Sequence, residues 1–323
     1  MYADSLILMA TYNGEQFIRE QIDSIRSQTY TDWVLMIRDD DSTDETPLII
    51  KEYAEMDERI VIADNIAKQG GAYFNFWTLI HNAQKMKKFK FYFFADQDDI
   101  WPAERMQWMI NEAEKKSEQV PLFIYGDMEI IDKDGNCMYE SLNKIMGIGR
   151  MSGFTEYYSS GFVWGCNTMI NYALFSQAPA YPLDDPYISI MSHDNYYAKY
   201  ALAIGNVIFI NKSCIKHRRH YSNTTGNNTL ALSPLLVFKK VLFGFESLAK
   251  THAIGYRQTL QTIKALNENK QGNCELEKVK RAIETGGFPA VFIMIKQKVK
   301  RKQFPRTCGI YFVMLLKAYK KYL

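Results

Sequence analysis

The segment "LILMATYNGEQFIREQIDSIRSQTYTDWVLMIRDD", Leu6 to Asp40, decides the fold. It places two apolar runs of strand length, "LILMA" and "WVLMI", on either side of a helical pattern. Between the runs Phe17, Ile18, Ile22 and Ile25 recur at the spacing of one helix face. Alternation of strand, helix and strand is typical of a parallel sheet covered by helices.

The same alternation continues beyond this segment. We expect a helix over 42–56, with Ser42 or Thr43 as N-cap and Pro47 in its first turn. The further expected elements are strands at 59–63 and 89–96 with a helix between them, a helix at 102–116, a strand at 121–127 and a hairpin at 129–139 turning at Asp134 and Gly135. The pattern predicts a doubly wound α/β fold that becomes mixed after residue 120.

Polar clusters follow three of the predicted strands. They are "TYNGE" after the first strand, "RDDDSTD" after the second and "DQDD" after the fourth. Ligands of doubly wound sheets bind beyond the carboxyl ends of the strands. We therefore expect the functional site at this edge of the sheet.

The aspartates in "FADQDDIW" are unusually close together, with Asp96, Asp98 and Asp99 in four positions after an apolar run. Carboxylates at this spacing repel one another unless a cation or a proton shift relieves them. The local pattern alone leaves a cation site and a solvated turn open.

Composition describes a folded chain of 323 residues with 47% hydrophobic content, enough for one large domain and an appendage. Five scattered cysteines support neither a disulfide framework nor a zinc cluster, which favours a reducing compartment. The N-terminus lacks the basic region of a signal peptide, so we expect a cytoplasmic protein.

The C-terminal part differs in charge from the rest. Nine basic residues and no acidic one follow Glu284, whereas the whole chain has a net charge of only +3. The apolar runs "VFIMI" and "IYFVMLL" are far shorter than the roughly 20 residues of a membrane span. A helical pattern places Phe288, Phe292, Ile295 and Val299 on one face beside lysines and arginines.

Two interpretations of this basic helix stay open. It can lie on an anionic membrane surface as a peripheral contact, or pack on the preceding domain with a solvated basic side. We expect no nucleic-acid partner, because the basic residues lack the interleaved aromatics of a recognised module.

Several segments together carry a family resemblance. They are "ATYNGEQFIREQIDSIRSQTYTDWVLMIRDDDSTDET", "FADQDDIWPAERM", "GFVWGCNTMINYAL", "SHDNYYAKYALAIG" and "HRRHYSNTTG". In this order they resemble the family 2 glycosyltransferases with a GT-A fold, which use nucleotide-diphosphate sugars. The resemblance covers about residues 5 to 226. It implies a GT-A domain over 1–228, a Rossmann-like mixed sheet, followed by a helical, basic region over 229–323.

The resemblance implies a nucleotide-binding role for the first two loops. The implied donor contacts are Thr11, Tyr12, Asn13, Glu15 and, on the second loop, Asp40. Tyr12 offers a ring that can stack on a base, and Asp40 an acceptor for the imide N–H of uracil or thymine. Asp41 stands where the family often has glycine, a departure that bears on how tightly this loop turns.

Asp96 and Asp98 correspond to the DxD pair of the family, which implies Mg²⁺ or Mn²⁺ on the donor diphosphate. For Asp99 we prefer a supporting role beside this pair, or a cap on the following helix. The late basic motif adds Arg218 near the diphosphate and His220 as a metal ligand.

Asp194 corresponds to the general base of inverting transfer, with His193 in place of the usual glutamate. A helix N-cap is the alternative role for Asp194. Gly165 and Asn167 resemble residues that line the donor and acceptor side.

The resemblance implies an inverting, metal-dependent enzyme that moves a single sugar to a growing cell-surface glycan or a lipid-linked glycan. "FADQDDIW" and "GCN" resemble a rhamnosyltransferase-like branch of bacterial polysaccharide biosynthesis, so dTDP-L-rhamnose is the first donor to test and UDP-sugars follow. The cytoplasmic enzyme would then work at the inner face of the cell membrane. A non-catalytic nucleotide-sugar-binding scaffold and a metal-dependent phosphohydrolase are the alternatives.

Overall fold

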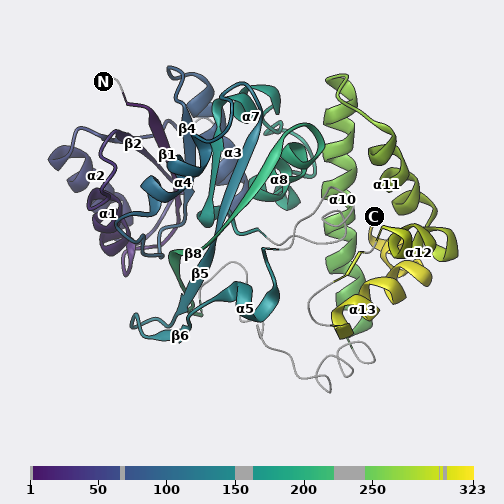
Figure 1. Cartoon of the computed structure of the whole chain (residues 1–323). Helices are drawn as coiled ribbons and strands as arrows, with labels where there is room; N and C mark the ends of the chain where they lie inside the picture. The colour runs from purple at the N-terminus through teal and green to yellow at the C-terminus, as the bar shows by residue number, and fades with distance from the viewer. Residues whose placement is uncertain (1–2, 66–69, 150–162, 222–243, 298, 301–303) are drawn as a thin grey trace.

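An eight-stranded mixed sheet forms the centre of the computed structural model (Figure 1). The structure describes residues 3–65, 70–149, 163–221, 244–297, 299–300 and 304–323. The strand order is β3-β2-β1-β4-β7-β5-β6, and β8 pairs with β5. The strands are β1 (Ser5–Thr11), β2 (Trp33–Asp39), β3 (Ile60–Ile62), β4 (Phe91–Ala95), β5 (Leu122–Ile131), β6 (Cys137–Tyr139), β7 (Thr168–Asn171) and β8 (Asn206–Arg218).

The first four strands run parallel, as the sequence predicts. β1 lies between β2 and β4, with Thr11 opposite Asp39 and Met9 opposite Ala95. The carboxyl ends of these three strands therefore meet at one edge, and the loops that follow them lie together. β7 is antiparallel to both β4 and β5, which makes the second half of the sheet mixed.

Helices cover both faces of the sheet because each has one apolar stripe. In α1, for example, Ile18, Ile22 and Ile25 are fully buried. The helices before the C-terminal region are α1 (Ile18–Arg26), α2 (Thr46–Met56), α3 (Ala72–Gln84), α4 (Arg105–Ala113), α5 (Leu142–Met146), α7 (Tyr172–Gln177) and α8 (His193–Ile204), with short 3₁₀ turns η1 (Gly165–Asn167) and η2 (Ile188–Ile190). One apolar cluster includes side chains of α1, α2 and α4, and the other includes those of α3, α7 and α8.

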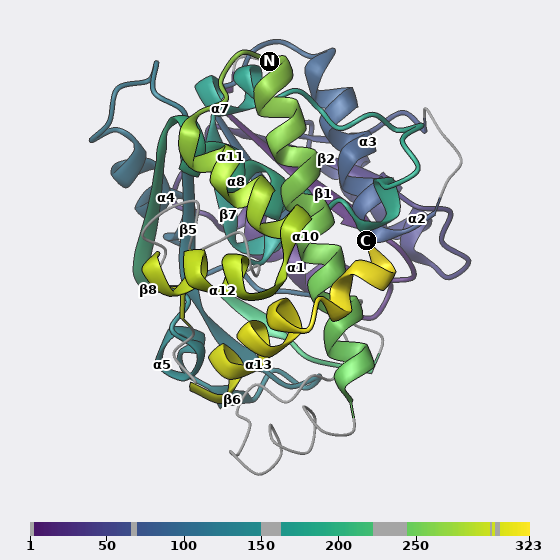
Figure 2. The same cartoon turned by 90° about the vertical axis from the view of Figure 1, so that its right-hand side faces the viewer.

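The C-terminal region is helical, as expected, and packs on α8 through the long helix α10 (Figure 2). It comprises α10 (Phe245–Glu268), α11 (Cys274–Thr285), α12 (Gly287–Lys296), α13 (Phe304–Leu315) and η3 (Ala318–Tyr322). The rings of Tyr256 of α10 and Tyr319 of η3 meet edge to face, 4.7 Å apart, inside the apolar cluster that also holds Tyr196. The region thus shares a core with the sheet domain. The boundary proposed at residue 228 lies outside the described residues.

Two local predictions are wrong. Helix α2 begins at Thr46 with Glu45 as N-cap, because the Ser42 hydroxyl is bound to Asp39 instead. The basic helix ends at Lys296, and Val299, whose N–H bonds to the Met294 carbonyl, is buried rather than on the face of Phe288.

The hairpin prediction is confirmed: β5 and β6 pair, and Gly135 in the turn has a φ of 87°. Within the described ranges, we find no helix with the length and apolar character needed to pass through a bilayer.

Candidate active site at the carboxyl edge of the sheet

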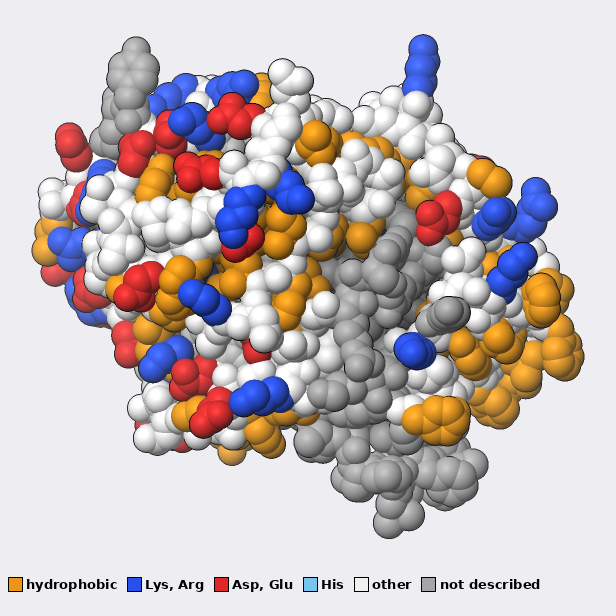
Figure 3. Space-filling view, in the orientation of Figure 1, with side chains coloured by type: hydrophobic (Ala, Val, Ile, Leu, Met, Phe, Trp, Pro, Cys, Tyr) orange, Lys and Arg blue, Asp and Glu red, His pale blue; other side chains and the backbone are white. Residues whose placement is uncertain are grey.

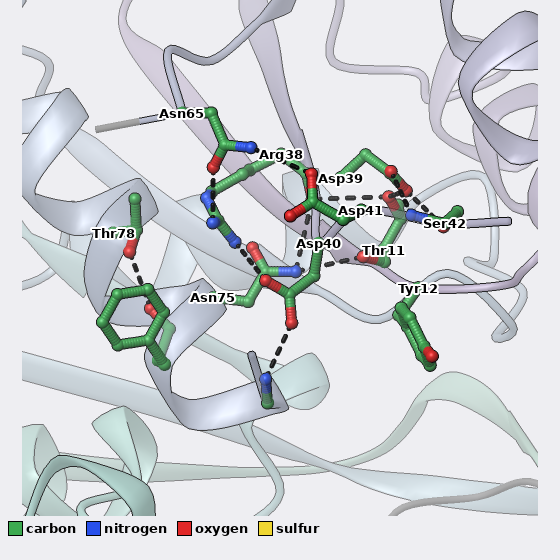
Figure 4. Close-up of polar contacts among 12 residues, drawn as sticks. Thr11, Tyr12, Arg38, Asp39, Asp40, Asp41, Ser42, Asn65, Asn75 and Thr78 are labelled. Atoms are coloured by element: carbon green, nitrogen blue, oxygen red, sulfur yellow. Dashed lines mark hydrogen bonds and ion pairs between the residues drawn. The ribbon is translucent and has the colours of Figure 1, made fainter. Parts of the chain in front are cut away.

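The loops after β1 and β2 are tied together by side-chain hydrogen bonds (Figure 4). Asp39 accepts from the Thr11 hydroxyl at 2.9 Å and from the Ser42 hydroxyl at 2.6 Å. Asn13 accepts from the backbone N–H of Thr43 at 2.8 Å through its side-chain oxygen. These bonds fix the shape of both loops before any ligand arrives.

Two residues of these loops adopt left-handed backbone conformations, Asn13 with a φ of 46° and Asp41 with a φ of 58°. Asparagine and aspartate tolerate this region better than most residues. Asp41, which stands where we expected glycine, therefore adopts a backbone conformation that glycine favours, and the loop can turn tightly.

Asp40 lies at the bottom of this loop pair with its side chain only 8% exposed. One oxygen accepts from the buried Arg38 guanidinium at 2.9 Å, and the other from the Gly71 N–H at 2.7 Å. Each carboxylate oxygen has a second lone pair, so Asp40 can still accept from a ligand.

Tyr12 is the exposed side chain of the first loop, at 56%, whereas Thr11 is buried. Glu15 is oriented by the Glu45 N–H, which donates to its carboxylate at 2.9 Å. Tyr12 is therefore the predicted donor contact whose ring is open to a ligand. The side chains of Thr11, Asn13 and Glu15 are hydrogen-bonded to residues at or after the end of β2.

Gln97, which the sequence did not single out, joins the first loop to the aspartate cluster. Its side-chain oxygen accepts from the Tyr12 N–H at 2.7 Å, and its side-chain nitrogen donates to the Tyr12 carbonyl at 2.8 Å. Gly14 makes room for this pairing, because a Cβ there would lie 2.4 Å from the Gln97 amide.

Asp96, Asp98 and Asp99 converge, each with an oxygen within 4.8 Å of the others. Burial and the charges of Asp99 and Asp98 raise the pKa of Asp96 to about 8. His220 joins the cluster, its Nε2 2.8 Å from an Asp98 oxygen. Clustered oxygens with one imidazole suit Mg²⁺ or Mn²⁺, so the donor set fits the expected metal.

Asp99 supports this cluster rather than capping a helix, since α4 begins at Arg105 with Glu104 as N-cap. Its carboxylate is 2.9 Å from Nδ1 of the buried His217 and accepts from the Arg218 N–H at 3.1 Å. Burial lowers the pKa of His217, but Asp99, Asp98 and Asp96 outweigh it and raise the value to about 9. A charged imidazolium thus offsets part of the carboxylate repulsion.

Arg218 is only 2% exposed, and its guanidinium points to protein acceptors. It donates to the carbonyls of Asp98 and Lys133, both at 3.0 Å, and forms an ion pair with Glu20. Arg218 braces the backbone of the aspartate loop, and its contact with a diphosphate stays a prediction.

Asp194 lies in the first turn of α8, whose N-cap is Ser192, so Asp194 is not the N-cap. The neighbouring His193 is buried against the rings of Phe76 and Phe94, at 4.1 and 4.6 Å. Burial lowers its pKa to about 4, so His193 is neutral at pH 7. Both ring nitrogens of His193 are buried and have no hydrogen-bond partner among the described residues, and Asp194 stays the predicted base of the pair.

Gly165 borders Asp194, since a Cβ at Gly165 would lie 2.6 Å from the His193 ring and 3.7 Å from the Asp194 Cβ. Asn167 is buried, and its amide nitrogen donates to the carbonyls of Gly126 and Asp127 at 2.7 and 3.1 Å. Gly165 is therefore placed beside the proposed base, whereas Asn167 ties η1 to β5.

Tyr73, in the first turn of α3, links the two ends of the site. Burial and the charges of Asp194 and Asp96 raise its pKa to about 12. Its ring is thus within electrostatic reach of both carboxylates, although the sequence separates them widely. His193, the neighbour of Asp194, packs on Phe94 two residues before Asp96, so the proposed base lies at the same edge of the sheet as the aspartate cluster.

Comparison with known proteins agrees with this geometry. The model of "Glycosyl transferase family 2" matches residues 6–178, more than half of the chain. The chain belongs to glycosyl transferase family 2. The expected family is thereby confirmed.

Two curated relatives of this family match parts of the chain. The UDP-Glc:alpha-D-GlcNAc-diphosphoundecaprenol beta-1,3-glucosyltransferase WfgD of Escherichia coli is 33% identical over 155 residues, 45% of this chain and 57% of WfgD. The dTDP-rhamnosyl transferase RfbG of Shigella flexneri is 40% identical over 100 residues, 31% of this chain and 34% of RfbG. The matches span about half or less of these relatives.

Solved structures confirm the GT-A type of fold for this family member. S. aureus TarS 1-349 in complex with UDP-GlcNAc aligns with a TM-score of 0.53 at 14% identity, over 98% of this chain and 92% of the TarS 1-349 chain. The mannosyltransferase PcManGT from Pyrobaculum calidifontis, in complex with GDP-Man and Mn²⁺, aligns with a TM-score of 0.50 at 15% identity, over 99% and 87%.

Proposed function

We propose that this protein is an inverting, metal-dependent glycosyltransferase that moves one sugar from a nucleotide-diphosphate donor to a glycan acceptor. The observation that carries the proposal is the convergence of Asp96 and Asp98 at the sheet edge where His193, the neighbour of Asp194, packs on Phe94 of β4. Membership of glycosyl transferase family 2 supports the same activity.

The donor would bind across the loops after β1 and β2. Tyr12 stacks on the base, Asp40 accepts its imide N–H, and Thr11, Asn13 and Glu15 hold the loop in place. We infer dTDP-L-rhamnose as the first candidate because RfbG is named a dTDP-rhamnosyl transferase, and UDP-sugars as the next because WfgD is named for UDP-Glc.

Asp96, Asp98 and His220 would hold Mg²⁺ or Mn²⁺, and PcManGT with its Mn²⁺ supports this choice of cofactor. When bound, the ion offsets the charge of the nucleoside diphosphate leaving group. Asp96 must lose its proton for this role, which a nearby cation favours. Asp99, paired with His217, keeps the cluster in place, and Arg218 braces it at the diphosphate end.

Asp194 acts as general base in the proposed step. An acceptor hydroxyl oxygen forms a bond to the anomeric carbon, its proton passes to Asp194, and the bond from that carbon to the diphosphate oxygen breaks. Attack from the face opposite the leaving group inverts the anomeric configuration. Gly165 forms the wall beside this base, and Asn167 holds the η1 turn that carries Gly165.

We infer a glycan or lipid-linked glycan as acceptor, because the WfgD name specifies a diphosphoundecaprenol acceptor. Such an acceptor sits at a membrane, so the enzyme would work from the cytoplasm at the inner face, in peripheral contact through its basic C-terminal region.

A panel of dTDP- and UDP-sugars tests the proposal with Mn²⁺, with Mg²⁺ and with EDTA. The preferred donor should raise the melting temperature only with metal, since a ligand at 100 times its Kd stabilises by about 2.7 kcal/mol. Nucleoside diphosphate release should then require an acceptor, and NMR of the product should give an inverted linkage. Release without acceptor would indicate a phosphohydrolase instead, and binding without turnover a scaffold.

A further inference from the structure

Two C-terminal helices expose large apolar side chains. On α12 these are Phe288, Phe292 and Ile295, at 79%, 68% and 57% exposure, and on α13 and just after it Phe304, Phe312 and Leu316, at 75%, 44% and 53%. We call these six side chains the apolar ridge. A surface helix normally presents polar residues on its outer face, so the ridge needs an explanation.

The ridge is not an unpacked inner face. The inner faces of α12 and α13 are already buried, through Ala290 and Met294 on one helix and Ile310, Val313 and Met314 on the other. The outward side chains of α12 recur at spacings of four and three residues, which gives a second apolar stripe along the helix.

The two helices contribute to one patch because α12 and α13 pack against each other. Figure 3 shows hydrophobic side chains gathered over the lower right of the molecule, where Figure 1 places these helices. Four of the six side chains are phenylalanine rings, which suit the boundary between headgroups and acyl chains.

The segment that carries the ridge is basic, although Glu246 lies beside it, next to Phe245, whose ring is 5.4 Å from that of Phe312. Lys296, Lys300, Lys317, Lys320 and Lys321 are exposed, and the sequence has no acidic residue after Glu284. Each basic residue near an anionic bilayer adds about 1 kcal/mol of attraction. Two copies meeting through this patch would instead bring like charges together.

We propose that the apolar ridge is the surface that seats this protein on an anionic lipid bilayer, with the rings in the interface and the lysines among the headgroups. The inference rests on the membrane contact proposed above and names the residues that make it. Apolar insertion and basic attraction supply the two signals that stable peripheral binding requires.

Vesicle co-sedimentation of the full chain tests the ridge. The parent should bind vesicles of phosphatidylglycerol and phosphatidylcholine at least about tenfold more tightly than vesicles of phosphatidylcholine alone, and high salt should weaken that binding. The F288Q/F292Q variant should lose about tenfold or more of the binding to the anionic vesicles.

The matched control is L48Q/M56Q, because Leu48 and Met56 are each 64% exposed on α2 of the sheet domain. This control should bind like the parent. Equal binding by F288Q/F292Q and the parent would overturn the proposal. So would a vesicle-free dimer that F288Q/F292Q converts to monomer, because the ridge would then be a contact between copies.

Sugar transfer to a water-soluble acceptor keeps the two proposals apart. F288Q/F292Q should transfer at the parent rate there, since the ridge lies outside the active site. If the parent transfers sugar but does not bind anionic vesicles, the ridge proposal alone is overturned. If the parent binds those vesicles but transfers no sugar, the glycosyltransferase proposal alone is overturned.

Discussion

The proposed donor and acceptor sides of the site are held by different forces. On the donor side, polar bonds such as those of Asp39 and Gln97 join three loops directly. On the acceptor side, Asp194 begins a helix packed among aromatic rings and covered by α10, which comes from the C-terminal region.

This difference follows from what each side would recognise. A nucleoside diphosphate presents fixed polar groups, and a preorganised polar network matches them with little ordering cost. The acceptor side is shaped instead by elements distant in the chain. Its apolar packing can accept changes in α10 without altering the donor loops.

We expect the largest loss of activity from a substitution on the proposed donor side. Asp98→Ala removes an oxygen of the carboxylate cluster and the partner of His220, so we expect transfer to fall by about 10³-fold or more. Product formation across a Mn²⁺ titration measures this. Glu55→Ala, on the exposed surface of α2, is the matched control. Full activity of the parent in EDTA would contradict the metal assignment.

The corresponding substitution on the proposed acceptor side should lower turnover without changing donor affinity. Asp194→Asn keeps the size of the side chain but removes its basicity, so we expect turnover to fall about 10²–10⁴-fold while donor affinity persists. Calorimetry with the nucleoside diphosphate and a transfer assay on the same preparation measure both. Asp184→Asn, an exposed carboxylate before α8, should match the parent. Transfer by Asp194→Asn at the parent rate would exclude Asp194 as the base.

Gln97→Ala tests the hydrogen-bonded link between the loop after β1 and the loop after β4. It removes two hydrogen bonds to the Tyr12 backbone, each worth about 0.5–1.5 kcal/mol, so we expect about tenfold weaker donor binding. Turnover at saturating donor should change less than threefold, by about half a kcal/mol. Titration calorimetry checks the affinity, with the exposed Gln84→Ala as control. An unchanged affinity would mean that the loops do not depend on this tie.

The smallest expected effect is that of Lys199→Met, which should change only how stability depends on pH. Burial lowers the pKa of Lys199 to about 7, whereas an unfolded lysine titrates near 10.5. Between pH 7 and 9 the unfolded chain therefore binds more protons, and the free energy of unfolding should rise with pH, by at most about 1.4 kcal/mol per unit. Lys199→Met should flatten this rise in melting temperature, and the exposed Lys278→Met should not. A parallel slope in Lys199→Met would contradict the burial argument.

The sequence predicted the parts of this molecule that depend on local pattern. Strands β1 to β6, the carboxyl-edge loops and the aspartate cluster follow from runs and spacings of nearby residues, whereas β7 and β8 were not predicted. Gln97, His217 and Tyr73 could not be found this way, since the hydrogen-bond partners of Gln97 and His217 lie 85 and 118 residues away along the chain. Ser42 was misassigned as a cap because a competing acceptor, Asp39, lies in the preceding strand.

The pairing of Gln97 with the Tyr12 backbone has a consequence for how the proposed enzyme would fill its site. The proposed base contact and the proposed ion site would share one short segment of chain, because Gln97 pairs with Tyr12 and lies between Asp96 and Asp98. Thermodynamic reciprocity requires that the ion raise nucleotide affinity by the same factor by which the nucleotide raises ion affinity. Ion and donor would then bind cooperatively, so that a low concentration of either one lowers the occupancy of both.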